Sequence, residues 1–139
     1  MLARLVSHPW AYPALEVVHI IGIAVLFGGL LVFELRALGL GRELPAPLLA
    51  RLTLRPALFG FGLCAVTGLT MFASQPDELL VNPAFRIKLL LIVLAGANAA
   101  LFHLRSGAAA IDGFAKAQCL LSLGFWLAVI ICGRWIAYV

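Results

Sequence analysis

The chain has 139 residues, of which 64% are hydrophobic and only 12% are charged, and its mean hydropathy is +1.10. A soluble domain could not cover so apolar a chain with polar surface, so the composition excludes a soluble globular protein and indicates an integral membrane protein. The net charge of +4 does not indicate nucleic-acid binding. The basic residues lie at the ends of apolar segments, where lipid phosphates are found.

Four apolar segments have the length of about 20 residues that a membrane-spanning helix needs. We predict spans at about 13–33, 56–73, 85–105 and 114–138 within one domain, residues 1–139. The predicted fold is all-α: an integral membrane four-helix up-and-down bundle. The first span is long enough to be a retained helix rather than a cleaved signal peptide. Residues 38–55 could include a short interfacial helix, and residues 74–83 carry the turn chemistry of a loop.

The distribution of basic residues predicts how the chain is oriented in its membrane. The connections after the first and third spans carry Arg36, Arg42, Arg51, Arg55, Arg105 and Lys116, whereas the other side carries Arg4, Arg86, Lys88 and Arg134. Lys and Arg favour the cytoplasm, so both termini are predicted to be periplasmic.

The first span contains ionisable residues, which are costly in hydrocarbon and therefore indicate function. Glu16 and Glu34 each lie about 60° from His19 around a helix, so the three are predicted to share an inward face. The opposite face carries Ala24 and Gly28, whose spacing permits close approach of another helix. That face could hold a second copy of the chain or a partner membrane subunit.

The third span places Lys88 and His103 on one face, and two inward histidines suggest a shared haem. The depths of the two histidines in the membrane argue against one shared haem. The first and third spans run in the same direction, with His19 level with Lys88, and His103 lies fifteen residues further on. That is about 22 Å of helix, too far for two ligands of one iron.

Two separate groups of polar residues are predicted instead, one near each boundary of the membrane. Near the cytoplasmic boundary, His103 is level with Glu34 and Arg36, and the three could form a polar cluster whose charges satisfy one another. Near the other boundary, His19 is level with Lys88, Met71 and Cys132. A His–Met pair could ligate a haem iron, and His, Met and Cys together could hold copper as Cu(I).

Several motifs carry a resemblance. They are W-x-Y-P…H-x-x-G-I-A at the start of the first span, E-L-R-x-L-G at its end, and N-P-A-F-x-x-K…N-x-x-x-F-H in the third. With them, most of the chain resembles a family of small four-helix bacterial inner-membrane proteins. That family is loosely similar to the copper-resistance D proteins and the b-type cytochrome bundles, whose helix histidines bind haem or metal. The chain differs from the copper-handling proteins in having only one internal methionine. It differs from two-haem cytochromes in having only three histidines, too few for four ligand positions.

Each candidate residue has a structural alternative. His19 could be a ligand or a hydrogen-bonded packing histidine, and His103 a ligand or the partner of Glu34. Lys88 and Arg86 could neutralise haem propionates or hold a quinone headgroup, or could simply extend to the membrane interface. The cysteines are predicted to be packing residues. The sequence shows no nucleophile–base pair, phosphate loop or zinc spacing.

The sequence therefore supports three alternative functions, of which the first is preferred. The first is a haem b protein that transfers electrons to or from a quinone or a partner protein. The second is a non-catalytic accessory or assembly subunit of a membrane complex. The third is a small copper permease.

Overall fold

The computed structural model describes residues 4, 7–105 and 109–139. Its long helices are α2 (Ala11–Ala37), α3 (Ala46–Ser74), α5 (Pro83–Arg105) and α6 (Gly113–Trp135), and α4 (Pro76–Val81) is a short helix. The described part of the chain contains no strand. The four long helices are each long and apolar enough to cross a membrane. These findings confirm the predicted all-α membrane bundle.

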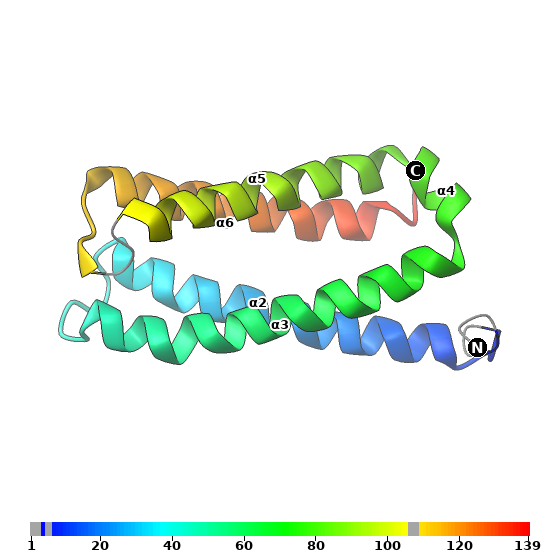
Figure 1. The fold of residues 1–139 in the computed structure, drawn as a ribbon, viewed down its shortest axis with the longest axis horizontal. Coiled ribbons are helices and arrows are strands. Elements are labelled where there is room, and N and C mark those ends of the chain that lie inside the picture. Colours follow the sequence, from blue (N-terminus) through cyan, green and yellow to red (C-terminus); the bar gives the residue numbers. More distant parts are fainter. Residues whose placement is uncertain (1–3, 5–6, 106–108) are drawn as a thin grey trace.

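The helices form two antiparallel pairs, α2 with α3 and α5 with α6 (Figure 1). We call the end with α4 and the C-terminus the terminal end, and the end with residues 38–45 and 109–112 the loop end. The two pairs meet where α2 contacts α6, whereas α3 and α5 hardly touch. Two of the four helices therefore join the pairs, and the side between α3 and α5 stays open.

Two predicted connections differ from the observed ones. The expected interfacial helix is not separate, because residues 46–55 form the first turns of α3, which continues through Pro56. A proline inside a helix removes one backbone hydrogen bond, and here that loss does not break the helix. The expected loop at 74–83 contains α4, which has Pro76 in its first turn followed by Asp77 and Glu78. Proline and acidic residues both favour a helix start.

Glycines bring the backbones of α2 and α3 into direct contact. A Cβ added to Gly60 would lie 2.7 Å from both the carbonyl oxygen of Gly22 and the backbone nitrogen of Leu26. A Cβ added to Gly29 would lie 2.5 Å from the carbonyl oxygen of Thr53. Small residues have this role in membranes, where lipid tails are as apolar as leucine and association depends on close packing.

An aromatic core joins the two helix pairs near the loop end. Its buried residues are Phe33, Ala37, Phe102, Ala115 and Cys119, contributed by α2, α5 and α6. The rings of Phe33 and Phe102 meet edge to face with centroids 6.0 Å apart, a favoured aromatic geometry. The pairs also meet toward the terminal end, where the rings of Phe72 on α3 and Phe85 on α5 stack with centroids 5.7 Å apart.

The face of α2 that carries Ala24 and Gly28 contacts no other helix. Ala24 is exposed, and a Cβ added to Gly28 would meet no atom within 4 Å. A homodimer or a partner subunit on this face stays a prediction.

The α2–α3 contact predicts opposite effects for two glycine substitutions on α3. Gly60→Ala should destabilise the protein by about 1–3 kcal/mol, because the added methyl meets backbone atoms that cannot move aside. Gly62→Ala is the matched control, since a Cβ there meets open space and alanine favours a helix over glycine. Thermal unfolding in detergent, followed by circular dichroism, measures both. A Gly60→Ala protein as stable as Gly62→Ala would contradict the contact.

Candidate functional site

His19 is held by a hydrogen-bonded relay between α2 and α3. Its Nδ1 lies 2.8 Å from the hydroxyl oxygen of Thr67, and that hydroxyl donates to the carbonyl oxygen of Leu63 at 2.7 Å. A hydroxyl has a single proton to donate. The Thr67 oxygen therefore accepts the proton of Nδ1, which leaves Nε2 of the neutral ring with a free lone pair.

The surroundings of His19 fix the ring in place. Thr67 is buried, and Gly68 lies beside the imidazole, since a Cβ added there would be in van der Waals contact with Cε1 of His19 at 3.5 Å. The thiol of Cys64 donates to the carbonyl oxygen of His19 at 3.5 Å. The sequence interpretation missed Thr67. Its signal was the stripe of small residues Thr53, Ala57, Gly60, Cys64 and Thr67 on α3, spaced three and four apart.

Lys88 of α5 lies beside this relay. It lies near His19, Cys64 and Cys132, and a Cβ added to Gly133 of α6 would lie 3.3 Å from Nζ. Among residues that the structure describes, the only ion pair joins Arg105 to Asp112. The half-buried amine of Lys88 therefore has no carboxylate partner there. We call His19, Thr67 and Lys88 the His19 site.

The other residues that were predicted to lie near the membrane depth of His19 have different environments. Cys132 lies close enough to Lys88 to interact with it, and Met71 is half-buried on α3. Arg86 is exposed, and its Nε donates to the carbonyl oxygen of Leu80 at 2.6 Å. Glu16 is exposed, so the prediction that it faces inward with His19 was wrong. It sits on the flank of α2, and no helix covers that flank at the terminal end.

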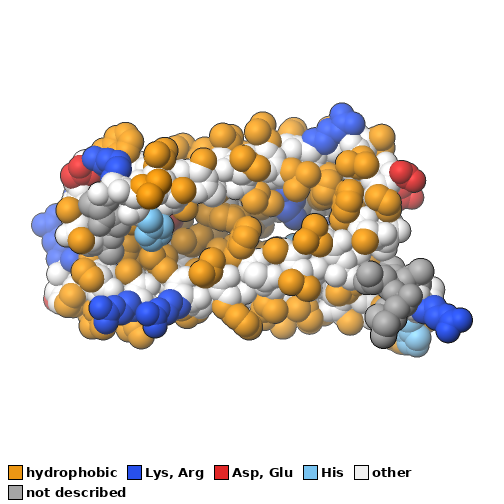
Figure 2. Space-filling view, in the orientation of Figure 1, with side chains coloured by type: hydrophobic (Ala, Val, Ile, Leu, Met, Phe, Trp, Pro, Cys, Tyr) orange, Lys and Arg blue, Asp and Glu red, His pale blue; other side chains and the backbone are white. Residues whose placement is uncertain are grey.

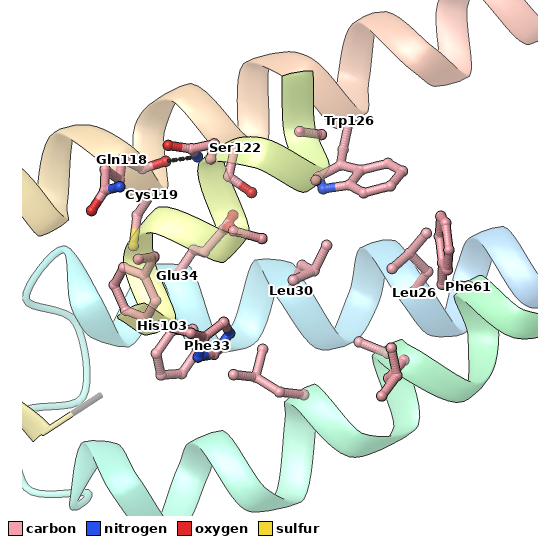
Figure 3. Close-up of a pocket in the computed structure, with 18 of the residues that line it drawn as sticks. Leu26, Leu30, Phe33, Glu34, Phe61, His103, Gln118, Cys119, Ser122 and Trp126 are labelled. Atoms are coloured by element: carbon pink, nitrogen blue, oxygen red, sulfur yellow. Dashed lines mark hydrogen bonds between the residues drawn. The ribbon is translucent and has the colours of Figure 1, made fainter. Parts of the chain in front are cut away.

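A second candidate site lies between the helix pairs, closer to the loop end. It is a cavity of about 440 Å³, which we call the Glu34 cavity (Figure 3). All four long helices line it. Its apolar wall includes Leu26, Leu30, Phe33, Phe61, Phe102 and Trp126, and its polar residues are Glu34, Arg55, Asn98, His103, Gln118 and Ser122.

Two buried side chains in this cavity have unpaired polar atoms. Glu34 is only 4% exposed and Gln118 only 5%, yet Glu34 Oε2, Gln118 Oε1 and Gln118 Nε2 have no hydrogen-bond partner among the described residues. The Ser122 hydroxyl lies beside the Glu34 carboxyl, and Asn98 donates to the backbone oxygen of Gln118 rather than to its side chain. Each unpaired buried group costs about 1–3 kcal/mol. Such groups are uncommon in folded proteins, and each one calls for an explanation.

The expected polar cluster of Glu34, Arg36 and His103 does not form. Glu34 is buried, as predicted, but Nε of Arg36 donates to the carbonyl oxygen of Leu44 at 2.7 Å. A residue two positions further along a helix is turned about 200° away, so Arg36 cannot face the same side as Glu34. His103 lines the cavity but is exposed, lies edge-on to the Phe102 ring and makes no ion pair with Glu34.

Gln118 is the cavity residue that the sequence interpretation missed. Its signal was a carboxamide inside the apolar fourth span, with Ser122 one helical turn further on the same face.

The two candidate sites are well separated. His19 and Glu34 are fifteen residues apart on α2, about 22 Å along the helix. Lys88 belongs to the first site and His103 lines the second. His19 and His103 therefore do not meet in one site.

Comparison with protein-family models, with curated proteins and with solved structures finds no match. Among the described residues, no group of three or more His, Cys, Asp or Glu is placed to hold a metal ion.

Oε2 of Glu34 is unpaired among the described residues, although the Ser122 hydroxyl lies beside the carboxyl. We predict that Glu34→Met stabilises the detergent-solubilised protein by about 1–3 kcal/mol, because an apolar side chain of similar size removes a buried polar atom that has no partner. Asn98→Leu should instead destabilise it by about 1 kcal/mol, since it breaks a satisfied hydrogen bond to Gln118. Thermal unfolding of both variants tests this contrast in sign. A destabilised Glu34→Met protein would show that the carboxyl has a structural partner.

Proposed function

We propose that this multi-pass membrane protein binds haem b through His19 and takes part in electron transfer. The observation that carries the proposal is the relay from His19 Nδ1 through the Thr67 hydroxyl to the Leu63 carbonyl. A histidine that ligates a metal nearly always donates its other ring N–H to a second group, which fixes the ring and its tautomer. His19 has this arrangement, and its Nε2 is the free ligand atom.

Lys88 supports haem over a bare metal ion. An intramembrane amine without a carboxylate partner needs an anion, and haem carries two propionates. A cation held by His19 and Cys132 would instead lie beside the charge of Lys88, which interacts with both of them. The electrostatics of the His19 site therefore favour an anionic cofactor and disfavour copper.

Within the proposal, His19 would ligate the haem iron and Lys88 would neutralise a propionate. Bound haem supplies a one-electron couple. The chain's own residues orient the imidazole, through Thr67 and Gly68, and keep the site within the apolar bundle. We further propose the bacterial inner membrane as the location, with the terminal end in the periplasm. This follows from the larger number of basic residues at the loop end.

The proposal predicts a Soret band for the protein purified in mild detergent from haem-replete cells, with a shift on reduction. His19→Ala should abolish the band, and Thr67→Val should lower haem occupancy, because valine cannot accept the proton of Nδ1. His103→Ala is the matched control and should keep the band, since His103 lies at the other site. The measurement is absorbance at equal protein concentration, before and after reconstitution with haemin.

Two results would contradict the proposal. One is a protein that stays colourless after reconstitution. The other is a band that His19→Ala leaves unchanged.

A further inference from the structure

We propose that the Glu34 cavity binds the ring head of a lipid-soluble quinone or quinol. The starting observation is that Glu34 Oε2 and both side-chain polar atoms of Gln118 are buried in the cavity without a partner. Polar atoms in such a position are normally satisfied by a ligand or by ordered water. The wall around them is mostly apolar, as in binding pockets for small organic molecules.

The unpaired atoms determine the chemistry of the ligand head. The amide nitrogen of Gln118 donates a hydrogen bond, its oxygen accepts one, and the carboxyl of Glu34 can do either. The carbonyl oxygens of a quinone accept hydrogen bonds, and the hydroxyls of a quinol also donate them. The same two side chains therefore suit both forms of an uncharged ring, and no change in their position is needed between the forms.

Burial and charge at the cavity argue against ionic lipid heads. The unpaired polar groups of the cavity are buried, with Glu34 only 4% exposed, so a charged fatty-acid or phospholipid head placed beside them would lose its hydration. Arg55, which also lines the cavity, is exposed at its edge and disfavours a cationic head. A neutral polar ring meets neither obstacle.

The size and aromatic wall suit a flat ring. The volume of about 440 Å³ falls within the range of about 300–1,000 Å³ found for small-molecule sites. Four aromatic residues line the cavity from four different helices: Phe33, Phe61, Phe102 and Trp126. Figure 3 shows Phe33, Phe61 and Trp126 around the space. Aromatic side chains pack favourably against one another and against other rings.

The open side of the cavity provides a route from the membrane. Space-filling shows the molecule hollowed between α3 and α5 (Figure 2), the two helices that hardly touch. On α5 this opening is lined by Gly96 and Ala99, and a Cβ on Gly96 would meet no atom within 4 Å. A ring can enter here while its isoprenoid tail stays in the lipid.

This proposal does not rest on haem binding, because it uses other side chains about 22 Å further along α2. The Soret band reports on His19, whereas the experiment below reports on Glu34 and Gln118.

Trp126 provides a local probe of the cavity. The chain has three tryptophans, and the other two, Trp10 and Trp135, are exposed outside the cavity. In the Trp10→Phe/Trp135→Phe background, we expect decylubiquinone to quench the remaining fluorescence along a saturable curve. Glu34→Met and Gln118→Leu should raise the half-quenching concentration about tenfold or more. The matched controls Glu16→Met and Gln75→Leu, which replace exposed residues, should leave it unchanged.

A steric variant tests the route independently of the polar groups. Gly96→Phe should also raise the half-quenching concentration, because the ring would project into the opening. Gly124→Phe on α6 is its control, since a Cβ there also meets open space but outside the cavity lining. Thermal unfolding of every variant separates loss of binding from loss of fold, and Glu34→Met is expected to be the more stable protein.

Three outcomes would overturn the proposal. The first is quenching that rises linearly and equally in all variants, because that indicates collisions within the micelle. The second is wild-type affinity in both Glu34→Met and Gln118→Leu. The third is displacement of decylubiquinone by oleic acid at equal concentration, which would identify a site for acyl chains instead.

Discussion

Direct backbone contact between α2 and α3 is the constraint on which the rest of this structure depends. In lipid, helices gain little from the hydrophobic effect, so their association relies on close packing. Gly22 and Gly60 let the two backbones touch, and Gly29 repeats the contact against Thr53 two turns along α2. This register also brings His19 onto Thr67. The same contact turns Glu34 away from α3 and toward the second pair of helices.

The second pair is attached toward the terminal end by the stacked rings of Phe72 and Phe85 and at the loop end by the aromatic core. Phe33, Phe102 and Cys119 pack there, while α3 and α5 otherwise hardly meet. A four-helix bundle that was packed on every side would leave no space for a ligand. The incomplete contact between the pairs therefore has a consequence for function, because it creates an internal cavity with an opening toward lipid.

Polar groups in the membrane interior are distributed between two environments. At the His19 site, the imidazole and Thr67 satisfy each other, and only Lys88 lacks an opposite charge among the described residues. In the Glu34 cavity, by contrast, the unpaired atoms belong to neutral or acidic groups. One environment suits an anionic cofactor and the other an uncharged polar ring. The two proposals therefore call for different ligands, and each can fail without affecting the other.

The amino-acid sequence was enough to predict a membrane protein with four spanning helices, because apolar length is a local property of the chain. It also determined that Glu34 faces inward and that His19 and His103 lie at different depths, since helical rise and turn are constant. Which side chains of different helices meet could not be predicted from the sequence and is seen in the three-dimensional arrangement. The partner of His19 is Thr67, Arg36 binds a loop carbonyl instead of Glu34, and Gln118 shares the cavity. These pairings depend on how each helix is rotated about its axis. That rotation is set by contacts between glycines and aromatic rings of different helices, which no single segment of sequence contains.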